Sequence, residues 1–418
     1  MRIGIDGSCL ANRRGFGRFA RQTLEALART PSAHEFVVFI DGPSAPHVSV
    51  PDRFETVVVD VGEAPTAAAS AAGRRRLRDM LAMGRAVAGA GLDLVYFPAT
   101  YSFFPVWNVK HVVVTMHDTL ALAHPDLVFP SRAGRIAWAL KEHAAGLWAD
   151  RIVTVSESAR RDLRDWFRWE ADRIDVVTEG PDAVFRPAPS DAESDRVLAK
   201  YGIEPGTPYL LYVGGLSPHK NLPRLIEAFA AGAPESFRLV LVGDISDVFH
   251  THIPVLRATV ARLGLEGRVH FPGFVPDEPL VHLYSRAYAL AQPSLMEGFG
   301  LPPVEAMACG TPILSSTAGS LPEVVGEAGV FFDPLDLDAM TRVLRDFCAN
   351  PAARDRLAAV ALERSNRFTW DAAAASLLKT FGSFEPKHPA RIHRAHHATP
   401  IHAGTPAKIP DRAGASPA

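Results

Sequence analysis

The chain has 418 residues, of which 47% are hydrophobic and 22% are charged, and its formal net charge is −2. This length exceeds one ordinary hydrophobic core, so we expect two globular domains. A nearly neutral chain has no overall field that attracts a polyanion, which excludes nucleic acid as an expected partner.

The three cysteines, Cys9, Cys309 and Cys348, are widely spaced and odd in number. They form neither a disulfide framework nor a set of metal ligands. The first residues read as a strand rather than as a signal peptide, and no apolar run approaches the roughly 20 residues of a membrane span. We therefore expect a cytoplasmic protein.

Short apolar segments alternate with amphipathic ones, which is typical of an α/β protein with parallel sheets. In the first half the predicted strands are residues 3–6, 36–40, 56–61, 94–97, 112–115, 152–155 and 175–177, and the predicted helices are 17–29, 74–88, 132–148 and 157–167. In the second half the predicted strands are residues 209–213, 239–242, 269–271, 289–292 and 313–315. The helices predicted there are 192–201, 222–230, 253–263, 279–285, 303–308, 336–349, 352–365 and 370–384.

A stretch rich in proline and glycine, residues 178–207, separates the two halves. It predicts a first domain at residues 1–185 and a second at 186–370, followed by a helix at 371–384 whose apolar face allows it to cross back to the first domain. From residue 385 to 418 proline, alanine and histidine dominate, which predicts a disordered tail. The tail histidines are irregularly spaced, so we favour a solvated tail over a metal-binding tract.

Residues 296–310 are the most informative segment. They carry two glutamates, Glu297 and Glu305, eight positions apart, with a Gly-Phe-Gly turn after the first and a helix expected around the second. A strand, a glycine loop and a helix in this order hold an anion at the helix N-terminus. A carboxylate repels phosphate, so we expect the glutamates to accept hydrogen bonds from hydroxyls while backbone N–H groups face phosphates. Hydroxyls beside a diphosphate indicate a nucleotide-sugar.

This spacing, followed by the turn Gly310-Thr311-Pro312, resembles the motif of the retaining glycosyltransferases of family 4. The resemblance covers residues 1–370 and is most specific in the C-terminal half. It implies the GT-B fold, in which two Rossmann-like domains with parallel sheets face each other. The first domain is then expected to bind the acceptor and the second to bind the nucleotide-sugar.

The resemblance also implies roles for the residues of this segment. Glu305 is expected to accept hydrogen bonds from the ribose hydroxyls, and Glu297 is expected to face the transferred sugar. By itself, Glu305 is equally well a helix-start glutamate that the helix dipole favours. Backbone N–H groups are expected to touch the sugar hydroxyls and the distal phosphate, and glycine permits the close approach that this needs. The residues of this backbone segment are Gly298, Phe299, Gly300 and Leu301.

A second donor segment follows the first strand of the second half. Gly214 and Gly215 end that strand, and Lys220 and Asn221 follow where a helix opens. The resemblance implies that this segment binds the diphosphate, with the Lys220 ammonium neutralising the charge that builds on the leaving nucleotide, as a metal ion does in other enzymes. No metal and no other cofactor are therefore expected.

The family places an arginine where this chain has Gly215. Two residues are candidates to replace that cation: His219, next to the lysine, and an arginine of the first domain such as Arg18.

A glycine-containing segment lies between the first predicted strand and the first predicted helix: Gly15, Phe16, Gly17 and Arg18. A plain turn explains such a loop, but its arginine and the helix that starts at Gly17 indicate an acceptor or diphosphate site.

His117 and Asp118 follow the buried strand predicted at 112–115, at the edge where α/β sheets bind ligands. The resemblance implies that His117 lies beside the reacting face of the sugar and that Asp118 orients it or the acceptor. A capped loop histidine is the structural alternative. In such retaining enzymes the leaving phosphate is thought to take the acceptor's proton, so His117 is not assigned as a general base.

Four further residues have weaker signals. Phe274 and Val275 match the segment that holds the base through backbone contacts. Ser156 reads as an ordinary helix N-cap, although the family also has a serine there. Glu323 matches a familiar family position, which we interpret as mainly structural.

Residues 74–78, with Arg85 further on, form a basic helix face. It is either a solvated face over a buried stripe or a docking surface for anionic lipid, where each basic residue contributes about 1 kcal/mol.

Together these features predict a retaining, metal-independent glycosyltransferase that moves a hexose from a nucleotide-sugar to a glycan or lipid-linked acceptor. Mannose from GDP-mannose is favoured over UDP-glucose or UDP-N-acetylglucosamine, and a bacterial envelope polysaccharide or exopolysaccharide is the expected product. The expected location is the cytoplasm, with peripheral contact at the inner face of the membrane as an open option. The alternatives are a nucleotide-sugar epimerase of GT-B type and a non-catalytic partner subunit that binds a nucleotide-sugar.

Overall fold

The apolar segments form the strands of two sheets. A computed structural model describes residues 1–12, 14–63, 76–129, 131–244 and 252–385. The first sheet contains β1 (Arg2–Asp6), β2 (Glu35–Asp41), β3 (Glu55–Val59), β4 (Leu94–Phe97), β5 (His111–Thr115), β6 (Arg151–Thr154) and β7 (Ile174–Val176). The second contains β8 (Tyr209–Val213), β9 (Arg238–Val242), β10 (Val269–Gly273), β11 (Ala289–Gln292), β12 (Ile313–Ser316) and β13 (Gly329–Phe332).

Helices connect these strands. In the first half they are α1 (Gly15–Arg29), η1 (Ala45–His47), α2 (Leu77–Gly89), η3 (Thr100–Ser102), α3 (Leu120–Ala123), α4 (Pro125–Val128), α5 (Arg132–Trp148), α6 (Glu157–Phe167) and η4 (Ala171–Arg173). In the second half they are α7 (Asp191–Lys200), η5 (Pro218–Lys220), α8 (Leu222–Gly232), α9 (Ile253–Arg262), α10 (Asp277–Arg286), α11 (Leu301–Ala308), α12 (Leu321–Val325), η6 (Gly326–Ala328), α13 (Leu337–Cys348), α14 (Pro351–Ser365) and α15 (Trp370–Gly382).

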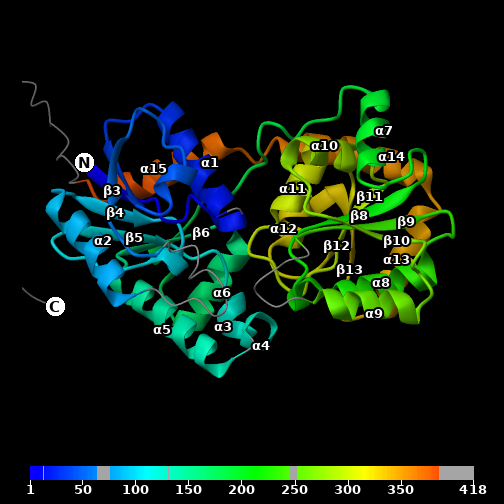
Figure 1. The fold of residues 1–418 in the computed structure, drawn as a ribbon, viewed down its shortest axis with the longest axis horizontal. Coiled ribbons are helices and arrows are strands. Elements are labelled where there is room, and N and C mark those ends of the chain that lie inside the picture. Colours follow the sequence, from blue (N-terminus) through cyan, green and yellow to red (C-terminus); the bar gives the residue numbers. More distant parts are fainter. Residues whose placement is uncertain (13, 64–75, 130, 245–251, 386–418) are drawn as a thin grey trace, which may run out of the picture. The chain divides into compact units, whose positions relative to one another are not determined.

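Both sheets are wholly parallel in the described part of the chain. The strand order is β3-β2-β1-β4-β5-β6-β7 in the first sheet and β10-β9-β8-β11-β12-β13 in the second. Helices cover both faces of each sheet (Figure 1), which explains why β8 is buried along all five residues. The predicted α/β class with parallel sheets is confirmed.

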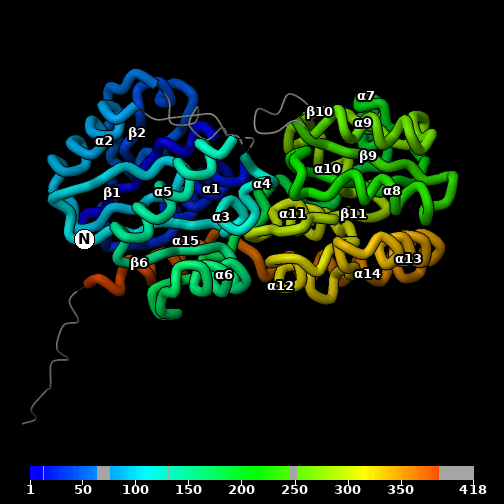
Figure 2. The backbone as a smooth tube through the Cα atoms, turned by 90° about the horizontal axis from the view of Figure 1, so that it is seen from below, coloured from blue at the N-terminus to red at the C-terminus, as the bar shows by residue number. Residues whose placement is uncertain are grey.

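The last helix, α15, packs against α1 (Figure 1, Figure 2). Its buried residues include Trp370, Leu377 and Phe381, and the Phe381 ring lies 5.5 Å from the ring of Tyr96 on β4. A helix that follows the second sheet in sequence therefore covers part of the first. Residues 1–384 form one compact unit, and the domain boundaries at 185 and 370 stay predictions.

The structure differs from the sequence-based expectation at several element ends. Helix α1 begins at Gly15 rather than at 17, so the four residues predicted as a glycine loop form its first turn. Helix α11 begins at Leu301, two residues earlier than predicted. Strand β13 and helix α12 were not predicted, because elements of four and five residues are too short to show a periodic pattern.

Some predicted features lie outside the described residues. These are the tail at 386–418 with its histidines and the first two arginines of the basic face, at positions 74 and 75. Among the residues that the structure does describe, no helix is both long enough and apolar enough to cross a bilayer.

Candidate active site

The predicted site residues lie where the strands of each sheet end. The order of winding reverses between β1 and β4 in the first sheet and between β8 and β11 in the second. Ligands of open α/β sheets bind outside the carboxyl ends of the strands at such switch points. Gly214 and Lys220 follow β8, Glu297 follows β11, and Arg18 follows β1, so three of the four strands at the switch points lead directly to predicted site residues.

Glu297 and Lys220 form a largely buried ion pair. Lys220 Nζ lies 2.6 Å from Glu297 Oε1, and their side chains are 15% and 12% exposed. The same oxygen accepts hydrogen bonds from Gln292 Nε2 and Ser294 Oγ, each at 2.7 Å. Burial would raise the pKa of Glu297, but the charge of Lys220 and its hydrogen bond, with that of Ser294, outweigh burial and lower the pKa. Glu297 is thus an ionised acceptor at neutral pH.

Glu305, on α11, is held by partners from distant parts of the sequence. Arg18, in the first turn of α1, forms an ion pair with Glu305 Oε1. The Tyr284 hydroxyl donates to Oε2 at 3.0 Å, and Arg18 also donates to both oxygens of Asp277, at 2.6 and 2.8 Å. The side chain of Glu305 is 5% exposed. Burial raises its pKa, although Arg18 and Tyr284 oppose the rise.

Two glycines shape the loop between β11 and α11. A Cβ atom on Gly298 would lie 2.6 Å from the carbonyl oxygen of His117 and 3.1 Å from the Cβ of Asp118, so a larger residue does not fit without a shift. Gly300 is the N-cap of α11 with a φ of +107°, which L-residues rarely adopt. Phe299 is buried, and the loop therefore offers backbone rather than this side chain to a ligand.

The His117 ring is enclosed by protein atoms. Its Nε2 lies 3.0 Å from the carbonyl oxygen of Pro98, and its Nδ1 lies 3.6 Å from Glu179 Oε1. The rings of Phe16 and Phe19 meet it edge-on, with centroids 4.8 Å away. Burial raises the pKa of Glu179, and the hydrogen bond and charge of His117 oppose this. Both ring nitrogens thus face protein oxygens, which suits a positioning role better than proton abstraction.

Asp118 lies at the contact with the Gly298 loop. Its Oδ1 accepts a hydrogen bond from the backbone N–H of Leu120 at 2.8 Å. Burial raises the pKa of Asp118; that hydrogen bond and His117 oppose the rise, and the charge of Glu297 adds to it. Lys220 opposes the effect of Glu297, so the Lys220–Glu297 pair acts on the Asp118 carboxyl with both signs of charge.

Comparison with known proteins identifies the family. The family models Glycosyltransferase Family 4 and Glycosyl transferases group 1 match residues 13–185 and 193–364. The O-antigen chain mannosyltransferase B of Escherichia coli is 33% identical over 270 residues, which are 65% of this chain and 70% of that protein. The chain belongs to the group 1, family 4 glycosyltransferases. The predicted glycosyltransferase class is confirmed.

Two solved structures share the fold of this glycosyltransferase. The sucrose-phosphate synthase of Thermosynechococcus elongatus superposes with a TM-score of 0.73 at 22% identity, over 92% of this chain and 98% of that chain. The HepE protein of Anabaena, solved in complex with UDP-glucose, superposes with a TM-score of 0.67 at 21% identity, over 92% and 100%. The predicted GT-B fold is confirmed.

His219 is one of the two candidates to replace the cation that the family places at Gly215. Burial, with the charge of Lys220, lowers the pKa of His219 to about 3 although Glu297 opposes this. The ring is therefore neutral near pH 7 without a ligand, and its role at a diphosphate stays a prediction. Arg18 does reach residues of the second half, but its partners there are Glu305 and Asp277. Its role at a diphosphate stays a prediction.

Asn221 and Phe274 differ in what they offer a donor. Asn221 has a φ of +57°, and its Nδ2 donates to the carbonyl oxygens of Pro293 at 3.2 Å and Pro334 at 2.9 Å. These bonds tie the start of α8 to the segments after β11 and β13. Phe274, after β10, is 62% exposed, whereas Val275 is buried. The Phe274 ring is thus accessible to a ligand, while Asn221 shapes the loop.

Glu323 and Ser156 connect α6 to the second half, and sequence reasoning did not find this. The Glu323 carboxylate accepts hydrogen bonds from the backbone N–H groups of Glu157 at 2.9 Å and Ser158 at 3.0 Å. Ser156 is the expected N-cap of α6 and also donates to the carbonyl oxygen of Gly298 at 2.6 Å. The Gly298 loop is therefore supported from the first half through Ser156 as well as through His117.

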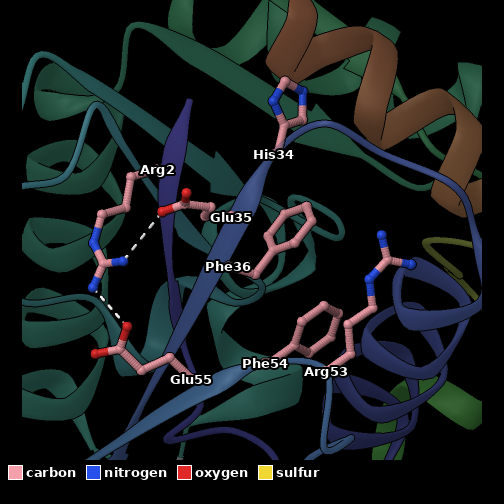
Figure 3. A pocket seen from close by; sticks show the side chains of 7 residues that line it. All are labelled: Arg2, His34, Glu35, Phe36, Arg53, Phe54 and Glu55. Carbon is pink, nitrogen blue, oxygen red and sulfur yellow. Dashed lines mark hydrogen bonds and ion pairs between the residues drawn. The ribbon is translucent and has the colours of Figure 1, made fainter.

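A cavity of about 300 Å³ lies at the amino ends of β1, β2 and β3, opposite to the strand ends that carry the predicted site residues. Figure 3 shows Arg2 between Glu35 and Glu55, with which it forms ion pairs of 3.4 and 2.6 Å. Because the cavity lies at the amino ends of the strands, it is separate from the candidate active site. We assign it no ligand.

Proposed function

We propose that this glycosyltransferase is a retaining, metal-independent enzyme that transfers a hexose from a nucleotide-sugar to a glycan or lipid-linked acceptor. The carrying observation is that Lys220 pairs with Glu297 at the β8–β11 switch point, where the Gly298 loop leads from β11 into α11 and its Glu305. An ammonium, two carboxylates and backbone N–H groups complement a ligand with one diphosphate and several hydroxyls. The UDP-glucose complex of the HepE protein supports the same donor class.

In the proposed reaction the second half binds the donor. Glu305 accepts hydrogen bonds from the ribose hydroxyls, Glu297 accepts them from the sugar, and Lys220 neutralises the charge that develops on the leaving diphosphate. The bond between the sugar's anomeric carbon and the diphosphate oxygen breaks, and the acceptor oxygen bonds to that carbon on the same face. The leaving phosphate takes the acceptor's proton. His117 and Asp118 border the reacting face from the first half.

Mannose from GDP-mannose is the proposed donor, and an envelope polysaccharide or exopolysaccharide is the proposed product. The similarity to the O-antigen chain mannosyltransferase supports both. The base is proposed to lie against the backbone of Val275 and the exposed ring of Phe274, contacts that carry little information about which base is bound. The relative's name supports mannose as the sugar and does not bear on the base, so GDP is the less supported part of this proposal.

One assay tests donor, stereochemistry and metal requirement together. The full chain is incubated with GDP-mannose or UDP-glucose and a mannose-terminated oligosaccharide in the presence of EDTA, and the product is analysed by NMR. We expect turnover of GDP-mannose, with the anomeric configuration of the donor kept in the product. An inverted product, turnover of UDP-glucose alone, or activity that EDTA abolishes and Mg²⁺ restores contradicts the corresponding part of the proposal.

We also propose a peripheral contact with an anionic membrane through α2 and α5. At the start of α2 the side chains of Arg76 and Arg78 are 51% and 68% exposed. On α5, Ile136, Leu140 and Leu147 are 62%, 66% and 84% exposed, and their spacing of four and seven places them on one face. Exposed apolar residues on one helix and exposed arginines on another of the same half suit a lipid surface.

The membrane contact has a direct test. The double substitution Leu140→Ser with Leu147→Ser should reduce co-sedimentation with vesicles that contain anionic lipid by about fivefold or more, because two buried leucines contribute several kcal/mol. The matched control changes Leu335 and Leu362, which are 68% and 40% exposed on the second half, to serine. Equal losses in both double variants, or no loss in either, would show that α5 is not the contact surface.

A further inference from the structure

Both carboxylate oxygens of Glu305 already have partners in the structure. Oε1 pairs with Arg18 and Oε2 accepts from Tyr284. A carboxylate oxygen can accept more than one hydrogen bond, but the Glu305 side chain is only 5% exposed, so a ribose hydroxyl needs the place beside it that Arg18 occupies. The guanidinium comes from α1 in the first half, whereas Glu305 and Tyr284 belong to the second half. The ribose and Arg18 therefore compete for one carboxylate.

Arg18 is held at this place by more than one contact. It donates to both oxygens of Asp277, at 2.6 and 2.8 Å, in the two-point geometry that guanidinium groups prefer. Its guanidinium also lies 5.6 Å from the centre of the Phe185 ring. Only 20% of the Arg18 side chain is exposed. These contacts make the blocked arrangement a specific one rather than a loose surface pairing.

The charges around the pocket favour a change of partner when a diphosphate arrives. Lys220 is already paired with Glu297, and Arg18 is shared by Glu305 and Asp277. These groups amount to three carboxylates and two cations, and Arg21 and Asp182 add one charge of each sign nearby. A diphosphate thus adds negative charge to a cluster in which carboxylates already outnumber cations. A guanidinium that turns from these carboxylates to the diphosphate leaves the net charge unchanged, but it pairs with the more highly charged group, which it binds in the same two-point manner.

We propose that Arg18 is a donor-operated switch: it blocks Glu305 in the donor-free enzyme, and a nucleoside diphosphate draws its guanidinium from Glu305 and Asp277 to the diphosphate. This inference rests on the proposed function and adds its regulation. The ribose takes the acceptor positions that Arg18 leaves. Donor binding thus breaks one contact between α1 and the second half and makes another, so the first half responds to an occupied donor site.

The switch predicts a change in nucleotide affinity that would not be expected if Arg18 only bound the diphosphate. Asp277→Asn keeps the shape of the side chain but removes its charge, so Arg18 is held less firmly. A weaker hold raises the fraction of enzyme that is open to the donor, and we expect binding of GDP, or of UDP if that is the preferred nucleotide, to tighten about 3- to 10-fold.

The substitution Arg18→Gln separates the two effects of Arg18, which are competition with the ribose and attraction of the diphosphate. It removes the competitor of the ribose, so binding of the nucleoside alone, guanosine or uridine, should tighten by a similar factor. It also removes the cation that would bind the diphosphate. The ratio of the affinity for the nucleoside diphosphate to the affinity for the nucleoside should therefore fall by about tenfold. The control is Arg29→Gln at the other end of α1, where Arg29 pairs with Asp371 at 2.9 Å; it should change neither affinity.

Isothermal titration of the full chain with GDP, UDP, guanosine and uridine decides between these outcomes. The switch is wrong if Asp277→Asn leaves nucleotide affinity unchanged or weakens it while the unaltered enzyme binds normally. It is equally wrong if Arg18→Gln leaves nucleoside affinity unchanged. An unaltered enzyme that binds neither GDP nor UDP overturns the proposed function and the switch with it. The two substitutions change different side chains, so either variant alone suffices should the other fail to fold.

Discussion

Replacing Lys220 with alanine should lower kcat by about 10²- to 10³-fold, the usual cost of removing one group that stabilises charge in a transition state. The Lys220 ammonium follows β8 and forms an ion pair with Glu297 at 2.6 Å. In the proposed reaction it offsets the charge of the departing diphosphate, which is greatest in the transition state. The KM for the donor should therefore rise less than kcat falls. Steady-state kinetics with the donor identified by the NMR assay measure both constants.

The same substitution has an effect on stability that must be separated from the kinetic one. Without Lys220, the carboxylate of Glu297 is left largely buried with no cation, a situation that costs about 3–5 kcal/mol when the charge is fully enclosed. A thermal melt sets the temperature below which the variant is folded, and kcat is measured there. The control is Lys110→Ala, which removes an exposed lysine paired with Asp93 at 2.7 Å. If the kcat of the folded Lys220 variant stays within threefold of the unaltered value, the lysine has no part in departure of the leaving group.

Replacing the two glutamates of the motif should affect different quantities, nucleotide affinity for one and kcat for the other. Glu305→Ala should weaken nucleoside diphosphate affinity by about 10- to 100-fold, since the ribose loses hydrogen bonds to a charged acceptor. Glu297→Ala should chiefly lower kcat, because its proposed partner is the sugar and a free nucleoside diphosphate contains no sugar at that position. Titration with GDP and UDP gives the first quantity, and turnover at saturating donor gives the second.

The contrast between the two variants is itself the control. An equal loss of nucleotide affinity in Glu297→Ala and Glu305→Ala would mean that the two carboxylates do not bind different parts of the donor. Unchanged binding and unchanged turnover in both variants would refute the assignments of both residues.

The sequence selects its main candidate residues through a local signal. Glu297, Gly298, Gly300 and Glu305 lie within nine residues, and one turn between a strand and a helix determines their placement. Lys220 was found in the same way, from a strand that ends in two glycines. The parallel sheets followed from apolar runs, because strands buried on both faces read as continuous hydrophobic segments.

The residues that the sequence did not reveal act across long distances in the chain. Glu179 contacts His117, and Asp277 and Tyr284 meet at Arg18 and Glu305. No local pattern marks them, since an isolated acid or tyrosine between apolar residues resembles an ordinary surface or core position. The sequence could not show the lowered pKa of His219 for a related reason: burial and the neighbouring lysine cause it, and burial is a property of the fold.

The most direct measurement is a crystal structure of the full chain with the nucleoside diphosphate that it binds. The ribose hydroxyls should lie within hydrogen-bond distance of Glu305, and the diphosphate should contact Lys220 and the backbone after Gly298. A nucleotide bound elsewhere, or held by neither Lys220 nor Glu305, would contradict the placement of the donor on which the proposed chemistry depends.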